Sequence, residues 1–507
     1  MTVRHTPAPA GRKNGTAAAG PAQEQGQPQD QTQNQTQNQT PDRPQADAGP
    51  VPPFPTRRRV LAAAGGLAAG FSAIGGLAAT PPARAGAENG TAASDTGAPA
   101  TVRSAASGRV SRQRLDELVA AAFPLFNAPV VLPAFDAATQ GAQNDVELHR
   151  LVSETVLPHT GERVAVTGLL ALPAGASGRL PVLSWQHGTI LSFDQVPSGL
   201  VRLAQPDFEP ADATDSLETL FNLHRFAARG YAVIAADYVG KGPLRAGRGE
   251  AYTVRDVTVR TCLDMLSAGE GAMRARGLEP GALFLHGWSQ GALNTQWLHQ
   301  ALRSSGRAVT GTATASPFND LVETWRYWAG AQTFPLPAGV KSYPALPDWI
   351  ALCMIMVLGS YELNYGLPGL MKSALRPDHR ALADTFWQTY ALSADDLKSV
   401  PAGPALLVAG FFDRFTDNRN SAFLRRLAAN TATCWNYDAP VRFCYGLADE
   451  AIHPDMACRP LAAGGAMTQG VAVAGASHRA TFLAGLYGSP ATLSGHDNVP
   501  AWFATLA

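Results

Sequence analysis

Residues 282–302 read ALFLHGWSQGALNTQWLHQAL and join a short apolar run to a helical pattern. The run 282–286 predicts a buried strand, and the residues after Gly291 predict a helix. Between them lies a G-x-S-x-G turn centred on Ser289. Glycines at its two ends let the backbone turn tightly, and such a strand–turn–helix lifts the serine hydroxyl off the sheet edge. The stretch therefore predicts Ser289 as a nucleophile. The alternative is a Gly/Ser turn without chemistry.

Other apolar runs repeat this alternation of strand and helix along the chain. They predict strands at 162–172, 180–185, 231–236, 282–286, 308–315, 441–445 and 470–474. The clearest helical pattern covers 253–276, and an amphipathic helix is expected from Ser111 to about Phe123. Continuous apolar strands alternating with helices predict a mainly parallel sheet with helices on both faces.

The interval from about 318 to 440 interrupts this rhythm. It is rich in aromatic residues and helical in pattern, and it is far longer than the crossover of about a dozen residues that two parallel strands need. We expect an inserted helical cap there. Its most apolar stretch, Trp349 to Leu358, is too short to span a membrane. This stretch is predicted to form the core of the cap, an apolar wall over a binding site, or both.

A serine hydroxyl needs a base, and the sequence offers two histidines for this role. His478 directly follows the last predicted strand, in Gly475-Ala476-Ser477-His478. His453 is the rival, but it would leave the loop after that strand unused. We therefore predict His478 as the base.

The acid that orients the base is predicted on the loop after the strand 441–445. Asp449 lies there, 29 residues before His478, which leaves room for one helix and one strand. Glu450 is adjacent, and the sequence does not decide which of these two carboxylates points at the histidine. Asp413 follows another strand-like run but would have to skip a strand. Asp449 is preferred, and the resulting order Ser289, Asp449, His478 is that of the α/β-hydrolase fold.

Acyl transfer also needs hydrogen-bond donors for the developing oxyanion. One is predicted to be the backbone N–H of Gln290, directly after the nucleophile. The loop after the strand 180–185 reads Gln186-His187-Gly188-Thr189, and we assign the second N–H to Thr189. An ordinary glycine turn is the alternative.

Several segments together resemble bacterial secretory lipases, relatives of the yeast-type lipase A group. The similar segments are 185–189, 197–198, 230–240, 287–292, 429–430, 439–440 and 446–449 within a match of about 150–490. The resemblance implies the α/β-hydrolase fold with a helical cap, lipase or carboxylesterase activity, the triad Ser289, Asp449 and His478, and no cofactor. The chain departs from the family in its loop 189–192, which lacks a second glycine, and in its cap. Preference for acyl-chain length therefore does not transfer.

The N-terminal part predicts export. Residues 1–55 are rich in Gln, Asn and Pro and predict a disordered polar extension. Residues 56–85 combine Arg57-Arg58-Arg59, an Ala/Gly-rich run and Ala83-Arg84-Ala85, which resembles a twin-arginine signal with cleavage after Ala85. An uncleaved membrane helix is the alternative. A linker is expected over 86–110 and the hydrolase domain over 111–507, with secretion or a periplasmic location.

The composition of the chain limits the classes of binding partner. Forty basic and forty acidic residues give a net charge of zero, with no long basic run after the signal, which argues against nucleic acid. No cysteine or histidine spacing predicts a metal site. Among Cys434, Cys444 and Cys458, one disulfide or free buried thiols are both open. The expected substrate is a small-molecule or lipid ester, with transient contact to a lipid interface left open. A peptidase or amidase, and a non-catalytic binding protein, remain alternatives.

Overall fold

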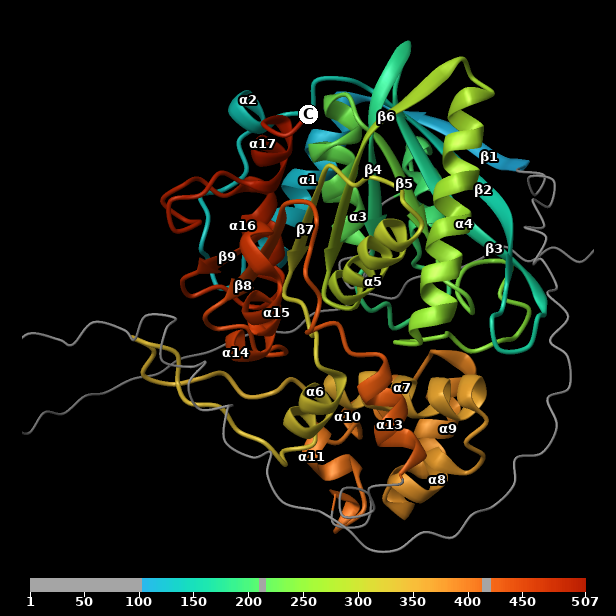
Figure 1. Ribbon diagram of the computed structural model, residues 1–507, viewed down its shortest axis with the longest axis vertical. Coiled ribbons are helices and arrows are strands. Elements are labelled where there is room, and N and C mark those ends of the chain that lie inside the picture. Colours follow the sequence, from blue (N-terminus) through green and yellow to red (C-terminus); the bar gives the residue numbers. More distant parts are fainter. Residues whose placement is uncertain (1–102, 209–215, 413–420) are drawn as a thin grey trace, which may run out of the picture. The chain divides into compact units, whose positions relative to one another are not determined.

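The computed structural model describes residues 103–208, 216–412 and 421–507, and their strands form one mixed sheet. The strands are β1 (Arg103–Val110), β2 (Val146–Val156), β3 (Arg163–Pro173), β4 (Gly178–Gln186), β5 (Ala232–Ala236), β6 (Leu278–Trp288), β7 (Gly311–Ala315), β8 (Val441–Gly446) and β9 (Thr468–Val473). They lie in the order β1-β2-β3-β5-β4-β6-β7-β8-β9 (Figure 1). The pairs from β5–β4 to β8–β9 are parallel, and β1–β2, β2–β3 and β3–β5 are antiparallel. The predicted, mainly parallel sheet is confirmed.

Strands β1 and β2 were not predicted. Residues 103–110, expected to end a linker, form β1 and pair with β2 along its length, so that part of the linker prediction is wrong. In β2, buried residues alternate with partly exposed ones, and charged residues such as Glu147 and Arg150 interrupt the apolar run. An antiparallel strand that is buried mainly on one face alternates in this way, whereas the prediction relied on continuous apolar runs.

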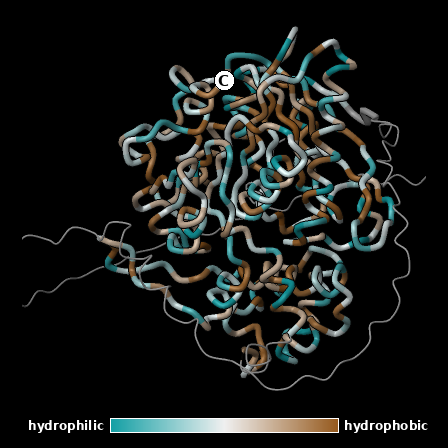
Figure 2. The backbone as a smooth tube through the Cα atoms, in the orientation of Figure 1, coloured by the Kyte–Doolittle hydropathy of each residue, from teal (hydrophilic) through white to brown (hydrophobic). Residues whose placement is uncertain are grey.

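Helices cover both faces of the sheet (Figure 1). One face carries α1 (Arg112–Phe126), α3 (Leu217–Arg225), α16 (His478–Tyr487) and α17 (Val499–Ala504), and the other carries α4 (Arg255–Arg274) and α5 (Gln290–Ser304). Two buried apolar clusters lie on these two faces, and hydrophobic residues run through the strands between them (Figure 2). The sheet is therefore buried on both sides over its parallel part.

Shorter elements connect these layers. They are α2 (Ala137–Gln140), α14 (Pro454–Ala457), α15 (Arg459–Ala463) and the 3-10 turns η1 (Pro197–Ala204), η2 (Ala227–Arg229) and η4 (Gly465–Met467). The helices α14 and α15 and the turn η4 lie in the crossover from β8 to β9. Because β8 and β9 pair in parallel, the loop of Asp449 after β8 and the loop of His478 after β9 are neighbours.

The predicted helical cap lies between β7 and β8 (Figure 1). Its helices are α6 (Leu321–Trp328), α7 (Ile350–Tyr365), α8 (Leu370–Ala374), η3 (Pro377–His379), α9 (Arg380–Thr389), α10 (Ala394–Lys398), α11 (Gly403–Leu406) and α13 (Ala422–Ala429). Every residue of α7 from Ile350 to Tyr361 is buried. The apolar stretch predicted at 349–358 is therefore the core of the cap.

Some predictions fall outside the described residues. These are the extension 1–55, the signal 56–85, the linker up to residue 102 and Asp413. In the described part, no helix combines the length and apolarity that a membrane span requires. All five cysteines lie in the described part and none forms a disulfide there, so Cys434, Cys444 and Cys458 are not paired with one another.

Candidate active site

Ser289 occupies a strained turn at the C-terminal end of β6. Its backbone has φ 56° and ψ −120°, and α5 begins at the next residue. The Ser289 N–H donates to Ala315 O on β7 at 2.9 Å, which fixes the turn to the neighbouring strand. A non-glycine residue at such a positive φ is costly and persists only where the surroundings hold it. The predicted strand–turn–helix around Ser289 is therefore present with the expected backbone geometry.

The two glycines of the motif allow the close packing of this turn. A Cβ on Gly287 would lie 2.2 Å from Gly291 O, and a Cβ on Gly291 would lie 1.9 Å from Gln186 O. Real Cβ atoms do not approach backbone oxygens so closely, so only glycine fits at either position. The spacing of these residues thus follows from contact between β4, β6 and α5.

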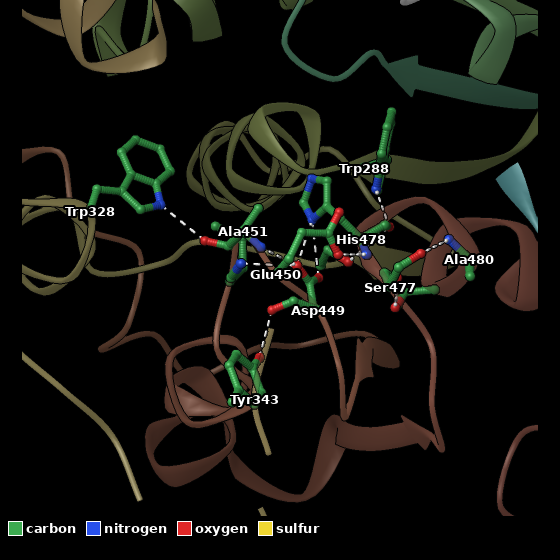
Figure 3. A network of polar contacts seen from close by, with 12 residues as sticks. Trp288, Trp328, Tyr343, Asp449, Glu450, Ala451, Ser477, His478 and Ala480 are labelled. Carbon is green, nitrogen blue, oxygen red and sulfur yellow. Dashed lines mark hydrogen bonds and ion pairs between the residues drawn. The ribbon is translucent and has the colours of Figure 1, made fainter. Parts of the chain in front are cut away.

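His478 and Asp449 form a buried pair on the loops after β9 and β8 (Figure 3). The register pairs Gly446 with Val473, which brings the two loops together. The His478 Nδ1 lies 3.0 Å from both Asp449 carboxylate oxygens. Asp449 Oδ1 also accepts the backbone N–H groups of Ala451 and Ile452, at 3.0 and 2.9 Å. The carboxylate is therefore held in place on one side and orients the imidazole on the other.

The backbone of His478 is fixed separately from its ring (Figure 3). Its N–H donates to Glu450 Oε2 at 3.0 Å, and its carbonyl accepts the indole N–H of Trp288 at 3.1 Å. Glu450, the neighbouring alternative to Asp449, thus binds the histidine main chain and leaves the ring to Asp449. The choice between these two carboxylates depended on loop conformation, which the sequence did not reveal.

His453 lies in a different environment from His478. Its ring stacks on Phe334 with centroids 4.7 Å apart, and its Nδ1 accepts the N–H of Asp455 at 3.2 Å. Burial lowers the pKa of His453 despite nearby acidic residues. This histidine caps α14 and does not line the cavity that contains Ser289.

Electrostatics favour a proton on His478. Burial alone lowers its pKa, but the charge and hydrogen bond of Asp449, assisted by Glu450, outweigh burial and the opposing charge of Arg479. The net result is a pKa raised above the usual value for histidine. Such an imidazole accepts a proton readily and stays close to a carboxylate that stabilises its charged form.

The loop after β4, residues 186–192, lies beside Ser289. The register pairs Gln186 with Gly287, so the loop leaves the sheet next to the serine turn. Thr189 lines the same cavity as Ser289, and its hydroxyl bonds to Tyr252 at 2.8 Å. His187 is buried, and its Nδ1 lies 2.7 Å from Gly188 O. Burial lowers the pKa of His187 to about 3, so the ring is neutral and the loop is held by its hydrogen bond.

Ser289, His478 and Thr189 open into one cavity of about 380 Å³. Its other lining residues are Leu191, Gln195, Trp288, Trp349, Glu450 and Arg479. The rings of Trp288 and Trp349 lie 5.1 and 6.1 Å from the His478 ring. Trp349, which begins the apolar stretch of the cap, therefore also forms a wall of the cavity, in agreement with the prediction of an apolar wall over a binding site.

Two contributors to the site were not predicted. Arg479, directly after His478, lines the cavity, and adjacency to the predicted base was the only available signal. Tyr343, from the segment between α6 and α7, donates its hydroxyl to Asp449 O at 2.6 Å (Figure 3). This contact joins residues 106 positions apart, and no local pattern in the sequence indicates it.

Solved structures share this architecture. The rice cell wall degrading esterase LipA from Xanthomonas oryzae aligns with a TM-score of 0.60 at 19% identity, covering 76% of this chain and 96% of that one. A putative hydrolase from Legionella pneumophila gives 0.59 at 17% identity, covering 74% and 92%. Lipase A from Candida antarctica in its closed state gives 0.51 at 13% identity, covering 74% and 77%.

The chain has the α/β-hydrolase fold. The fold prediction, including the cap between β7 and β8, is confirmed. By sequence, the chain matches no family model and no curated protein. The similarity to solved structures therefore concerns the α/β-hydrolase architecture, and membership of the secretory lipases stays a prediction.

Proposed function

We propose that this chain is a serine hydrolase of carboxylic esters, with Ser289 as nucleophile, His478 as base and Asp449 as its orienting acid. One observation carries the proposal: Ser289, at φ 56°, lines the same cavity as His478, and the buried carboxylate of Asp449 binds the Nδ1 atom of that imidazole. Strained serine turns at a strand end and paired His–Asp side chains recur where serine is made nucleophilic.

In the proposed reaction, His478 Nε2 takes the proton of Ser289 Oγ as the oxygen attacks the ester carbonyl. Asp449 stabilises the imidazolium that forms through its contacts with Nδ1. The negative charge that develops on the carbonyl oxygen is bound by the backbone N–H groups of Gln290 and Thr189. Because Gln290 is the first residue of α5, the helix N-terminus adds to this stabilisation.

Collapse of the tetrahedral intermediate transfers the proton from His478 to the leaving alcohol and leaves an acyl group on Ser289. A water molecule then attacks this acyl-enzyme, with His478 again as base. The acid is released, and Ser289 regains its proton.

The cavity supports an apolar acyl group of limited length. Its walls include two indole rings and Leu191, and its volume of about 380 Å³ is near the lower end of the range of ~300–1,000 Å³ for small-molecule sites. We therefore propose short to medium acyl esters as substrates. Membership of the secretory lipase family, implied by the sequence resemblance, is part of this proposal.

The test is hydrolysis of a p-nitrophenyl ester series from acetate to palmitate by residues 86–507. We expect the rate to peak at short to medium chains and to fall by several orders of magnitude in Ser289→Ala. Ser494→Ala is the matched control, because Ser494 also has a positive φ, of 53°, but does not line the cavity. Turnover of amides or peptides alone would replace the ester proposal with a peptidase or amidase. An unreactive Ser289 would leave a binding protein.

Export through a twin-arginine signal is the proposal for location. Replacing Arg57, Arg58 and Arg59 by lysine should retain the precursor in the cytoplasm, because twin-arginine transport depends on the paired guanidinium groups. Fractionation of expressing bacteria and N-terminal sequencing of the exported chain test this. Export of the lysine variant, or a mature end other than Gly86, would contradict the assignment.

A further inference from the structure

Two fully buried, oppositely charged side chains lie on the segment between β5 and α4. Lys241 and Glu250 have side chains that are 0% and 1% exposed, and Lys241 Nζ lies 3.4 Å from Glu250 Oε2. Burying an ion pair is costly, and an apolar pair of similar volume is often at least as stable. Neither residue is among those lining the cavity. Stability alone therefore gives a poor account of this buried pair.

The lysine end of the pair binds the loop of residues 186–192. Lys241 Nζ donates to the carbonyls of Ile190 and Ser192, at 2.5 and 2.6 Å. These carbonyls belong to the residues that follow Thr189, the proposed second oxyanion donor. The ring of Tyr390, at the end of α9 in the cap, lies 4.0 Å from Nζ and covers the ammonium group. The loop is thereby fixed to a charge that water does not reach.

The glutamate end binds the other oxyanion donor. Glu250 Oε1 accepts the side-chain amide of Gln290 at 2.8 Å, and Gln290 is itself buried. The backbone N–H of Gln290 is the proposed first donor. Contacts therefore run without interruption from the loop of Thr189 through Lys241 and Glu250 to Gln290.

We propose that Lys241 and Glu250 are positioning residues that hold the two oxyanion donors at a fixed separation. The inference rests on the proposed function and adds the device that shapes its oxyanion hole. A charged, hydrogen-bonded connection resists displacement better than apolar contacts, which have no preferred direction. Because an oxyanion forms only during the reaction, loss of this device should lower kcat far more than it raises KM.

The test compares wild-type residues 86–507 with the double variant Lys241→Met/Glu250→Gln. Removing both charges avoids an unpaired buried ion and retains an amide that can bond to Gln290. The matched control is Glu270→Gln/Arg307→Met, which removes another acid–base pair that packs between α4 and the loop before β7. We measure kcat, KM and thermal unfolding for each, with p-nitrophenyl butyrate as substrate.

Two inhibitors separate positioning from general damage. An alkylboronic acid forms a tetrahedral adduct on Ser289 and uses the oxyanion hole, whereas the alkyl carboxamide of equal length mimics bound substrate. In the double variant we expect kcat to fall about 10- to 1,000-fold. Boronate affinity should fall in parallel, while KM and carboxamide affinity stay within about threefold of wild type, which marks a loss confined to the transition state.

The outcomes are distinct. If the wild type turns over esters and the double variant has the same kcat, this inference is wrong and the proposed function stands. If the double variant loses boronate and carboxamide affinity equally, this inference is wrong as well. A wild type without ester turnover overturns the proposed function, and this inference falls with it. If the double variant has no cooperative unfolding transition, Lys241→Met alone decides, because it removes both hydrogen bonds to the carbonyls of Ile190 and Ser192. Unchanged kcat and boronate affinity in that variant would reject the positioning role.

Discussion

At the scale of single residues, the proposed nucleophile Ser289 has an unfavourable backbone conformation. Its φ of 56° with ψ of −120° is a conformation that glycine adopts at little cost and other residues do not. Backbone hydrogen bonds hold it there: its N–H donates to Ala315 O on β7, and its carbonyl accepts the N–H groups of Ala292 and Leu293 at 3.0 and 3.3 Å. The strained backbone of Ser289 therefore lowers the stability of the folded chain, a cost that is common at functional sites.

Replacing Ser289 by glycine should abolish ester hydrolysis and raise stability. Relief of backbone strain is worth ~1–3 kcal/mol, and the flexibility that glycine adds to the unfolded chain offsets part of this, leaving a gain of about 1 kcal/mol. Ser289→Ala is the control, since it removes the hydroxyl but keeps the Cβ that causes the strain. Thermal or denaturant unfolding of both variants measures the difference. Equal stability of the two would contradict the argument.

The pH dependence of hydrolysis should respond in opposite directions to the two charged neighbours of His478. In the proposed mechanism the free imidazole is the base, so kcat/KM should fall as pH drops through its raised pKa. Glu450 raises the pKa of His478 and Arg479 lowers it. Glu450→Gln should therefore move the acidic limb of the profile to lower pH, and Arg479→Gln should move it to higher pH.

Profiles of kcat/KM between pH 4 and 9 measure both shifts. Substitution of Arg303, an exposed arginine on α5 outside the cavity, by glutamine controls for net charge. Shifts of the same sign in the two neighbour variants would show that His478 is not the titrating base.

At the scale of elements, the segment between α6 and α7 supports the acid loop from the cap side. Tyr343 donates to Asp449 O, and Phe334 stacks on His453 beside it. Because Asp449 must stay aligned with His478, this support is expected to matter for rate more than for substrate binding.

Tyr343→Phe should lower kcat about three- to tenfold with little change in KM, as expected for loss of one hydrogen bond of ~0.5–1.5 kcal/mol. Tyr327→Phe is the matched control, because Tyr327 packs against Phe334 in the same aromatic group. Steady-state kinetics on one ester compare the two. A similar loss in both would point to packing of the segment instead of the bond to Asp449.

The sequence predicted strands β3 to β9 because their apolar runs are nearly continuous. It also indicated which loops carry Ser289, His478 and the acid, since parallel neighbours end at the same sheet edge. It could not distinguish Asp449 from Glu450, whose directions depend on N–H groups of the folded loop. Tyr343 and the buried pair Lys241–Glu250 were also beyond prediction. Their roles depend on contacts between distant segments.

At the scale of the described molecule, cap and sheet share one apolar cluster. Buried residues of α7 and α9 belong to the same cluster as those of α4 and α5. Hydrogen bonds cross between the two parts as well. The hydroxyl of Tyr361 donates to Thr253 O at 3.1 Å, and the indole of Trp297 donates to Asn430 O at 3.1 Å. The cap is thus packed as an integral layer.

That shared cluster has a consequence for how the proposed esterase would act on an emulsified substrate. A lid that swings open at an oil droplet must part from the body at low cost, and here the parting would expose buried side chains of both. We therefore expect ordinary saturation on dissolved tributyrin, with no abrupt rise in rate once the solubility limit is crossed. A sharp rise at that point would mean that α7 and its neighbours leave the sheet far more easily than their packing suggests.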